Sequence, residues 1–430
     1  MAEHLSRNVN QIFSQPAIPE KWEDLFEERL SNLPAGLQSQ RAEAWKLARQ
    51  SDFPTRKDES WRWMDYSELP LADLEIRGKD SLGLQFQLVP TAMDAAPRNW
   101  KNLPEGVLVT SVKGLLSRQP ELVEKAFSRS RIALEGKFAQ LASALAGDGL
   151  FVYIPKNTAL EDVIQVRLNL DLDRKAVWTH SIIWIEANTQ AAIELDWMSA
   201  NSGGQGLHNG ALEVFLGEGA HLHLDERQHF SAADWNISHA DVSLEADAGL
   251  EWNLAVFGAK SSKNFVKVDL KGKGSHAKLK GVMFPERGQV VNLDTRQNHW
   301  DVSTSSDLIY KSVAANQGKS IWHGMIYVDP KAQQTDAYQS NKNLILDDSA
   351  EVKTNPGLEI LADDVKCSHG ATVGRIDDTE LFYLQARGIP ENEAQKLIVE
   401  GFYNQVLESF RLESTRESLR EMLVEKMEEL

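Results

Sequence analysis

Cys367 and His369 have the clearest potential for chemistry, because they stand two positions apart in the stretch DDVKCSHGA. Cys367 is the only cysteine among the 430 residues. If this stretch is a β-strand, a thiolate and an imidazole lie side by side on one face. Both groups bind soft metals, but a tetrahedral site needs four ligands. The pair is therefore either half of a metal site that a partner chain completes, or a buried cysteine beside a satisfied histidine.

A second group of possible metal ligands lies in HLHLDERQH, residues 221–229. On a β-strand, His221 and His223 share one face with Asp225 in phase, and His229 is nearby. This pattern fits a zinc pair with a carboxylate, and it fits equally well histidines on a solvated strand face. The sequence supplies no defined third ligand, so both interpretations stay open.

The motifs of common enzymes are missing from the chain. The stretch QGKS at 317–320 resembles the end of a phosphate-binding loop, but position 313 is Val313 and the residues that follow read as a strand. We find no G-x-S-x-G elbow, no H-E-x-x-H and no paired C-x-x-C. We therefore expect no catalytic residue, no cofactor-binding residue, no nucleotide bound by this chain and no enzymatic activity of its own.

The residues that surround these candidates alternate between apolar and polar types from residue 150 to about residue 376, as in VIQVRLNLDL and FVKVDLKG. Such alternation predicts a succession of short β-strands. A turn signal followed by a strand recurs at Gly219, Gly249 and Gly274, and a repeat of about 20–50 residues is typical of solenoids. The pattern favours a β-helix, whose coils stack on one another, over a large β-sandwich.

Helical regions are predicted on both sides of this core. Trp61, Trp63 and Tyr66, in FPTRKDESWRWMDYSEL, are interpreted as an aromatic anchor between the first region and the core. We expect a mostly helical N-terminal region over 1–147, a parallel β-helix core over 148–376 and a C-terminal helical domain over 377–430. The last region has an apolar stripe at helical spacing, formed by Ala394, Ile398, Phe402, Val406 and Phe410 and widened by Leu397 and Leu407.

The charge and the N-terminus limit the environment of the protein. The formal net charge is −17, with 63 acidic and 46 basic residues, and no run of five Lys or Arg occurs. Such a surface repels nucleic acid and anionic membranes, so we expect neither as a partner. The N-terminal residues lack the apolar core of a signal peptide, and one cysteine excludes an internal disulfide framework. We expect a cytoplasmic protein.

Residues 340–402 closely resemble the SufB/SufD family of iron–sulfur cluster assembly proteins. The resemblance rests on TNPGLEI, CSHGATVGRID, LFYLQARGI and EAQKLIVEGF, and FPTRKDESWRWMDYSEL looks like the N-terminal signature of the family. The middle of the chain resembles the family only in its general pattern of residue types. Within the family the chain is more similar to SufD, because SufB-type chains are usually longer and often have additional cysteines.

The resemblance implies a mainly β fold with a right-handed parallel β-helix core, flanked by N-terminal and C-terminal helical regions. It implies a scaffold subunit of the SufBCD complex, which pairs with SufB through the β-helices and docks the ABC-type ATPase SufC through the C-terminal helices. By motif position, His369 and, more weakly, Cys367 match residues at the SufB–SufD interface. A transient Fe–S cluster would then be shared with the partner, and SufB would supply the remaining ligands. A homodimer is the other assembly to consider.

The alternative function is that of a cytosolic β-helix enzyme acting on carbohydrate. It predicts turnover by the isolated chain and a cleft of acidic residues on one face of the β-helix. The scaffold hypothesis predicts no turnover by the chain alone and association with an ATPase.

Overall fold

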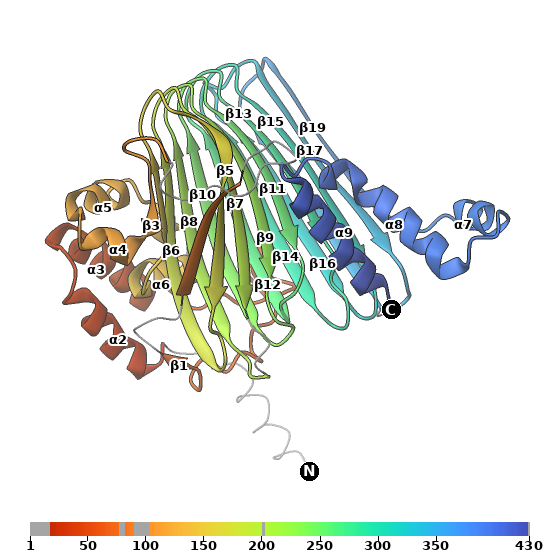
Figure 1. Cartoon of the computed structure of the whole chain (residues 1–430), viewed down its shortest axis with the longest axis horizontal. Helices are drawn as coiled ribbons and strands as arrows, with labels where there is room; N and C mark the ends of the chain where they lie inside the picture. The colour runs from red at the N-terminus through yellow and green to blue at the C-terminus, as the bar shows by residue number, and fades with distance from the viewer. Residues whose placement is uncertain (1–17, 77–81, 90–102, 200–202, 429–430) are drawn as a thin grey trace, which may run out of the picture.

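The computed structural model describes residues 18–76, 82–89, 103–199 and 203–428. Its body is a parallel β-helix with helices at its N-terminal end and along one side near its C-terminal end, which confirms the predicted fold class (Figure 1). From β4 onward, successive strands alternate between two facing sheets, so each strand pairs in parallel with the strand two places further along the chain. Among the first strands, β2 pairs with β5 and β3 pairs with β4, both antiparallel.

The two sheets contain all the named strands of the described residues. The first consists, in spatial order, of β3 (Leu108–Ser111), β4 (Leu150–Ile154), β6 (Lys175–Ile185), β8 (Leu207–Leu216), β10 (Trp235–Leu244), β12 (Ser261–Leu270), β14 (Val290–His299), β16 (Lys319–Val328) and β18 (Glu351–Ile360), with β1 (Glu75–Ile76) beside β6. The second consists of β2 (Leu82–Val89), β5 (Ala159–Leu170), β7 (Gln190–Ser199), β9 (His221–His229), β11 (Gly249–Val256), β13 (His276–Met283), β15 (Ser305–Ala314), β17 (Thr335–Ile345) and β19 (Val365–Arg375).

The coils repeat about every 30 residues, within the range expected for a solenoid. Trp235 pairs with Ser261, and Ser261 pairs in turn with Val290. Gly219 and Gly274 lie at turns with positive φ, as the sequence predicts, because a residue without a side chain adopts this conformation without strain. Gly249 differs from that prediction, since it is the first residue of β11. The QGKS stretch also enters a strand, β16, and no helix follows it.

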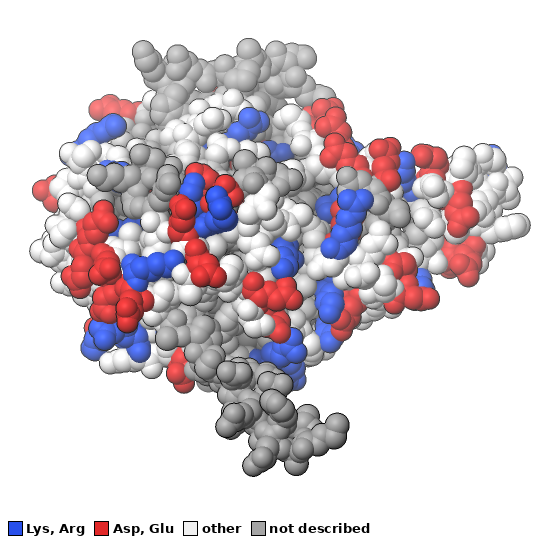
Figure 2. Space-filling model, turned by 90° about the horizontal axis from the view of Figure 1, so that it is seen from below, with Lys and Arg blue, Asp and Glu red and all other residues white. Residues whose placement is uncertain are grey.

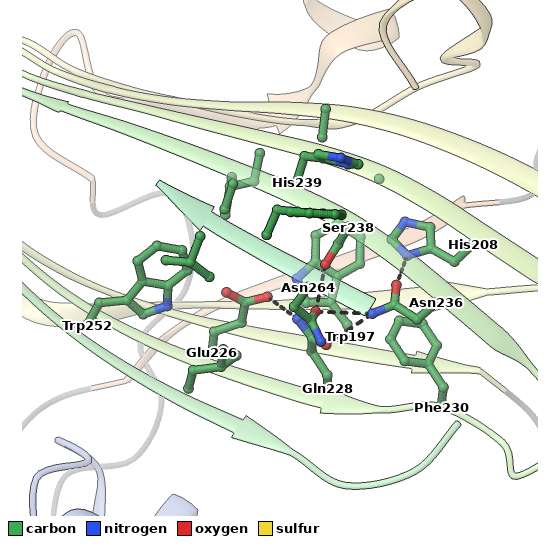
Figure 3. A pocket seen from close by; sticks show the side chains of 17 residues that line it. Trp197, His208, Glu226, Gln228, Phe230, Asn236, Ser238, His239, Trp252 and Asn264 are labelled. Carbon is green, nitrogen blue, oxygen red and sulfur yellow. Dashed lines mark hydrogen bonds between the residues drawn. The ribbon is translucent and has the colours of Figure 1, made fainter. Parts of the chain in front are cut away.

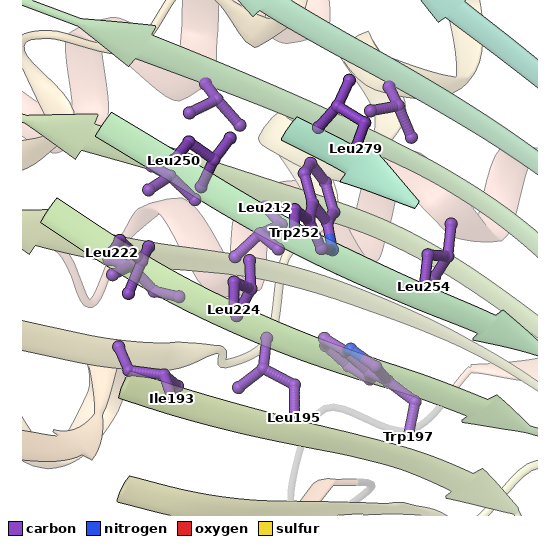
Figure 4. Close-up of a cluster of buried hydrophobic side chains, with 14 of the residues drawn as sticks. Ile193, Leu195, Trp197, Leu212, Leu222, Leu224, Leu250, Trp252, Leu254 and Leu279 are labelled. Atoms are coloured by element: carbon purple, nitrogen blue, oxygen red, sulfur yellow. The ribbon is translucent and has the colours of Figure 1, made fainter. Parts of the chain in front are cut away.

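The core between the sheets is built from apolar side chains that stack from coil to coil (Figure 4). Leu222 pairs with Leu250, and Leu224 pairs with Trp252, so apolar residues of successive coils lie beside one another along the solenoid axis. Burial of each such side chain contributes about 1.5–3 kcal/mol. The stacking explains why an alternating sequence without a strict repeat still forms one continuous core.

The N-terminal helices cover the outer face of the first sheet (Figure 1). Trp61 stacks on Phe138 with ring centroids 5.1 Å apart and contacts Phe265 of β12, while Trp63 stacks on His323 of β16. These contacts confirm that the aromatic segment anchors the region to the β-helix. The helices are α2 (Glu20–Leu30), α3 (Ala35–Gln50), η1 (Glu59–Trp61), α4 (Val112–Leu116), α5 (Pro120–Phe127), η3 (Ile132–Glu135) and α6 (Lys137–Leu145).

The C-terminal helices are α7 (Asp378–Gln385), α8 (Glu391–Leu407) and α9 (Glu413–Glu428). Helices α8 and α9 pack on the outer face of the second sheet, where Tyr403 donates a hydrogen bond to the Met283 carbonyl at 2.6 Å. Ala394, Val406, Leu407 and Phe410 of the predicted apolar stripe are buried. Ile398 and Phe402 are only half-buried, and Val399 and Tyr403 are buried in their place.

The surface seen in Figure 2 carries Lys and Arg side chains among Asp and Glu side chains, with no single large basic area on that face. In the described parts of the chain, no helix is long and apolar enough to cross a membrane.

Candidate functional site

The β-helix ends in two open edges. Strand β18 is the last strand of the first sheet and pairs only with β16 among the described residues, and β19 ends the second sheet beside β17. Each edge strand presents a row of unpaired backbone donors and acceptors, which is a template for another chain. In Figure 1, α7 and part of α8 extend past β19 on this side of the molecule, while the side chains of β18 and β19 are half-buried or exposed.

Cys367 and His369 both lie on β19, the outermost strand. Cys367 pairs in register with Ala337 of β17, and His369 pairs with Gln339. The side chains of Ala337 and Gln339 are buried, and aligned neighbours in a parallel sheet share a face, so both candidate residues face the interior side of the solenoid where it ends. The strand geometry therefore places the thiol and the imidazole side by side, as the i, i+2 spacing predicts.

The thiol is partly shielded. Cys367 is half-buried against a small apolar cluster that includes Leu358 and Val365. This burial raises the pKa of the Cys367 thiol, a hydrogen bond with the backbone of Ala337 lowers it, and the charge of Asp336 raises it further. The net effect disfavours the thiolate, which is the form that binds metal. A cation that arrives beside Cys367 would shift the balance toward the thiolate.

The imidazole is more accessible than the thiol. His369 is exposed at the edge of the solenoid, next to Gln339. Gln339 donates a hydrogen bond to the Gly357 carbonyl of β18 at 2.9 Å, which links the two sheets below the open end. Its Oε1 atom and the Thr354 hydroxyl are buried without a hydrogen-bond partner among the described residues. Gln339 is aligned with His369, so the environment of the pair is polar as well as apolar.

No complete metal site exists around this pair in the described residues, because no group of three His, Cys, Asp or Glu side chains is arranged to hold an ion. The pair offers two side chains of types that can bind metal, and they differ in softness. A chain that adds strands to this edge would bring further side chains to within coordination distance.

Exposed apolar side chains surround the same end of the molecule. Tyr338 of β17 is 39% exposed, Val373 of β19 is 46% exposed, and Leu361, which follows β18, is 52% exposed. An apolar patch rimmed by polar groups marks an interaction surface more often than a free surface. Tyr338 lies on the outer face of β17, since it alternates with the buried Ala337 and Gln339, whereas Val373 is in phase with Cys367 and His369 on β19.

A second exposed apolar surface lies on α7. Phe382 is 68% exposed and Tyr383 is 57% exposed, and α7 has no buried residue. Leu397 of α8 is exposed nearby in the fold, although the sequence places it on the core stripe. Helix α7 projects from the body, and its tip is mostly uncharged surface (Figures 1 and 2).

The histidine motif at 221–229 is arranged differently from the predicted zinc pair. His223 Nε2 lies 2.9 Å from Asp225 Oδ1, and His223 Nδ1 lies 3.3 Å from Glu251 Oε2. Burial opposes the charged ring, but these two carboxylates together raise the pKa of His223. Both ring nitrogens of His223 are engaged, so His221 and His223 do not form a metal pair on β9.

Sequence reasoning missed a polar network inside the β-helix (Figure 3). Glu226 accepts a hydrogen bond from Gln228 at 2.9 Å, Gln228 accepts one from Asn236 at 3.1 Å, and Asn236 contacts His208 Nδ1 at 2.8 Å. Burial raises the pKa of Glu226 to about 7, although the hydrogen bond from Gln228 lowers it. Along β9, Glu226 lies at one of the alternating positions whose side chains point into the core. This position was the sequence feature from which a buried polar group could have been predicted.

Comparison with known proteins identifies the family of the chain. Residues 168–402, more than half of the chain, match the family described as the SufBD core domain of the SUF system for FeS cluster assembly. Residues 84–166 match the SufBD protein N-terminal region. The chain therefore belongs to the SufBD family of iron–sulfur cluster assembly proteins. This membership does not support the carbohydrate-enzyme alternative.

Curated relatives agree with this family. The chain is 27% identical over 303 residues to an iron–sulfur cluster assembly SufBD family protein of Staphylococcus epidermidis, strain ATCC 12228. It is 27% identical over the same length to a protein of that description from Staphylococcus aureus, strain USA300. In both cases the match covers 70% of this chain and 65% of the relative. These relatives are described by family, and their descriptions do not separate SufB from SufD.

Proposed function

We propose that the chain is the SufD-type subunit of a cytoplasmic SufBCD complex, a scaffold on which Fe–S clusters are assembled and which has no turnover of its own. The observation that carries the proposal is the open end of the β-helix. On one surface it combines two strands that each have one free edge, exposed apolar side chains and two side chains that could be part of a metal site. The single cysteine supports the SufD type over the SufB type.

The proposed contact with SufB is edge-to-edge. Strands β18 and β19 would pair with strands of SufB, so that their free backbone groups form hydrogen bonds across the interface. His369 would lie at this contact with Cys367 beside it, and SufB would supply the remaining ligands of a transient cluster. The cluster is cargo in this proposal, bound between the chains and then passed on.

The proposed contact with the ATPase SufC lies on the C-terminal helices. Helices α8 and α9 are fixed to the second sheet by buried side chains, whereas α7 is held by few contacts and presents Phe382 and Tyr383 to solvent. In this proposal SufC binds the exposed aromatic side chains of α7, and α8 and α9 transmit its movement to the β-helix because they are packed on the second sheet. Nucleotide would bind to SufC and not to this chain.

Native mass spectrometry of the protein recovered anaerobically from its host tests the assembly. We expect a complex that contains a SufB-type chain and an ATPase. Recovery of a lone monomer at low salt would contradict the proposal, and turnover of a carbohydrate by the isolated chain would replace it with the alternative function.

His369→Ala separates a ligand role from a purely structural one. We expect the complex to form as before, because His369 is exposed and contributes little to packing, while Fe–S enzymes in cells lose activity. Cys367→Ser should cause a smaller loss. If both variants leave the Fe–S enzymes active, the pair has no role in cluster assembly.

The double substitution Phe382→Ser with Tyr383→Ser tests the ATPase contact. Both side chains are exposed, so we expect an unchanged fold and a loss of ATPase from the purified complex, with the SufB-type chain retained. Leu134→Ser, which removes an equally exposed apolar side chain from η3, is the matched control. Retention of the ATPase by the double variant would exclude α7 as the docking surface.

A further inference from the structure

The link between α8 and α9, residues 408–412, is fastened to the outer face of the second sheet by buried polar groups. The Arg411 backbone N–H donates a hydrogen bond to Asp225 Oδ2 at 2.7 Å, and Asn253 Nδ2 donates one to the Ser409 carbonyl at 2.9 Å. Asp225 of β9 and Asn253 of β11 are aligned in register, and they are 1% and 3% exposed. These two side chains therefore hold the point at which the chain passes from α8 to α9.

His223 contacts the same carboxylate. Its Nε2 atom lies 2.9 Å from Asp225 Oδ1, and its Nδ1 atom lies 3.3 Å from Glu251 Oε2. Only the imidazolium has a hydrogen on both nitrogens, so a ring with a carboxylate at each nitrogen fits the charged form. His223 also lines a groove of about 320 Å³ with Glu251 and Arg411, which gives solvent protons access to the ring.

The hydrogens of Asn253 are fully used in this arrangement. Its amide group has two hydrogens, one directed to Asp225 Oδ1 at 2.7 Å and one to the Ser409 carbonyl. The same nitrogen lies 3.4 Å from His223 Nε2. In a neutral ring with its hydrogen on Nδ1, the bare Nε2 atom therefore competes for a hydrogen that holds Asp225 or Ser409.

The other neutral form of His223 also weakens the attachment. With the hydrogen on Nε2, the bond to Asp225 remains but loses the strength that a charged donor gives. Within the described residues, His223 is the one cationic side chain within ion-pair distance of Asp225, since Arg227 pairs with Glu194 and Asp196. A buried carboxylate that loses its cation is costly. Separation of the link from β9 and β11 is the movement that admits water to Asp225.

The groups around His223 determine how readily the ring is protonated. On β7 its neighbour is the uncharged Ala192. Asp225 and Glu251 favour the imidazolium, whereas His221, His276, Lys278 and Arg411 oppose it, and Lys278 lies 3.3 Å from Glu251. Burial lowers the pKa of His223, but the hydrogen bonds and charges of the two carboxylates raise it above the ordinary 6.5 overall. Stability that the protonated ring contributes is complete below the ordinary pKa and is lost as the pH rises through the raised one.

From these contacts we infer that His223 is a pH-sensitive latch for the C-terminal helices. The imidazolium holds Asp225 and leaves both hydrogens of Asn253 to Asp225 and Ser409, which fixes the link on the second sheet. When the proton is lost the link loosens, while the apolar contacts of α8 and α9 keep the helices on the sheet. The inference is independent of the proposed function, because it concerns contacts within this chain alone.

Hydrogen–deuterium exchange of the full chain, followed by mass spectrometry, tests the latch. Protection of the link is measured at pH 6 and pH 8.5, after correction for the effect of pH on intrinsic exchange. We expect protection to fall at least about threefold between these pH values. His223→Gln keeps a donor beside Asp225 but does not titrate, so its link should be equally protected at both. Asp225→Asn should lower protection at both pH values, because the Arg411 N–H loses its carboxylate acceptor.

His221→Gln is the matched control, since it makes the same substitution two residues away on the same face of β9. It should keep the fall in protection that the parent shows. Glu226 titrates in all these variants, so it does not account for a difference between them. The inference is wrong if the parent link is equally protected at both pH values, if the fall persists in His223→Gln, or if His221→Gln abolishes it as well, with every variant folded by circular dichroism.

Discussion

At the scale of single residues, the chemistry of Cys367 depends on its partial burial. Because its pKa is raised above the usual range of a thiol, little thiolate is present at neutral pH. We predict that iodoacetamide alkylates Cys367 more slowly at pH 7.5 than it alkylates a small free thiol, with the rate still rising above pH 9. Mass spectrometry measures this directly, since the chain has only one cysteine. A rate at pH 7.5 equal to that of the free thiol would show that the side chain is not shielded.

Glu226 makes a prediction about stability and pH. Its folded-state pKa of about 7 lies above the ordinary value of 4.5, so the folded chain favours the protonated acid. This raised pKa costs no stability below about pH 4.5, and stability is lost as the pH rises toward 7, by about 3 kcal/mol in full. Glu226→Gln should therefore raise the melting temperature relative to the parent at pH 8 and much less at pH 5. An equal difference at both pH values would contradict a titrating Glu226.

At the scale of elements, the aromatic segment around Trp61 determines whether the N-terminal region stays on the β-helix. Trp61 is 8% exposed and packs on both Phe138 and Phe265, so Trp61→Ala creates a cavity that costs about 3–5 kcal/mol. We expect limited proteolysis to release the N-terminal region from this variant while the β-helix remains intact. Trp300→Ala, at a tryptophan that is 39% exposed, is the control and should resist cleavage as the parent does.

At the scale of the whole molecule, β18 and β19 each have one edge without a strand partner among the described residues. A solenoid that stops without a cap leaves strand edges and apolar side chains that associate with another chain. We predict that the isolated protein self-associates through β18 and β19 as its concentration rises, and that Leu361→Asp with Val373→Asp shifts it to monomer. Sedimentation velocity over a range of concentrations measures this shift.

The control for that prediction is Leu134→Asp, which places the same charge on an exposed leucine that is 69% accessible and far from the open end. This variant should associate like the parent. If both variants are monomeric or both associate, the self-association does not involve β18 and β19. These edge strands would then pair only with a different chain.

Several features could be predicted because they depend on local sequence. Alternation of apolar and polar residues requires only neighbours along the chain, and turns near Gly219 and Gly274 require only a residue that tolerates positive φ. The same locality places Cys367 and His369 on one face of a strand, since i and i+2 always share a face. The aromatic anchor of Trp61 and Trp63 was likewise recognisable from its composition.

Other features depend on which coil lies beside which, and strand register over some 30 residues cannot be read from a single sequence. His276 meets His221 only because β11 places Gly249 between them. Glu226 titrates near neutrality only because stacked coils remove it from water. The sequence by itself therefore determined the β-helix, the flanking helices and the ligand pair on one strand face. Tertiary structure alone decided which residues surround this pair, such as Ala337 and Gln339 of β17, because these neighbours come from another coil, and local residue patterns do not encode the register between coils.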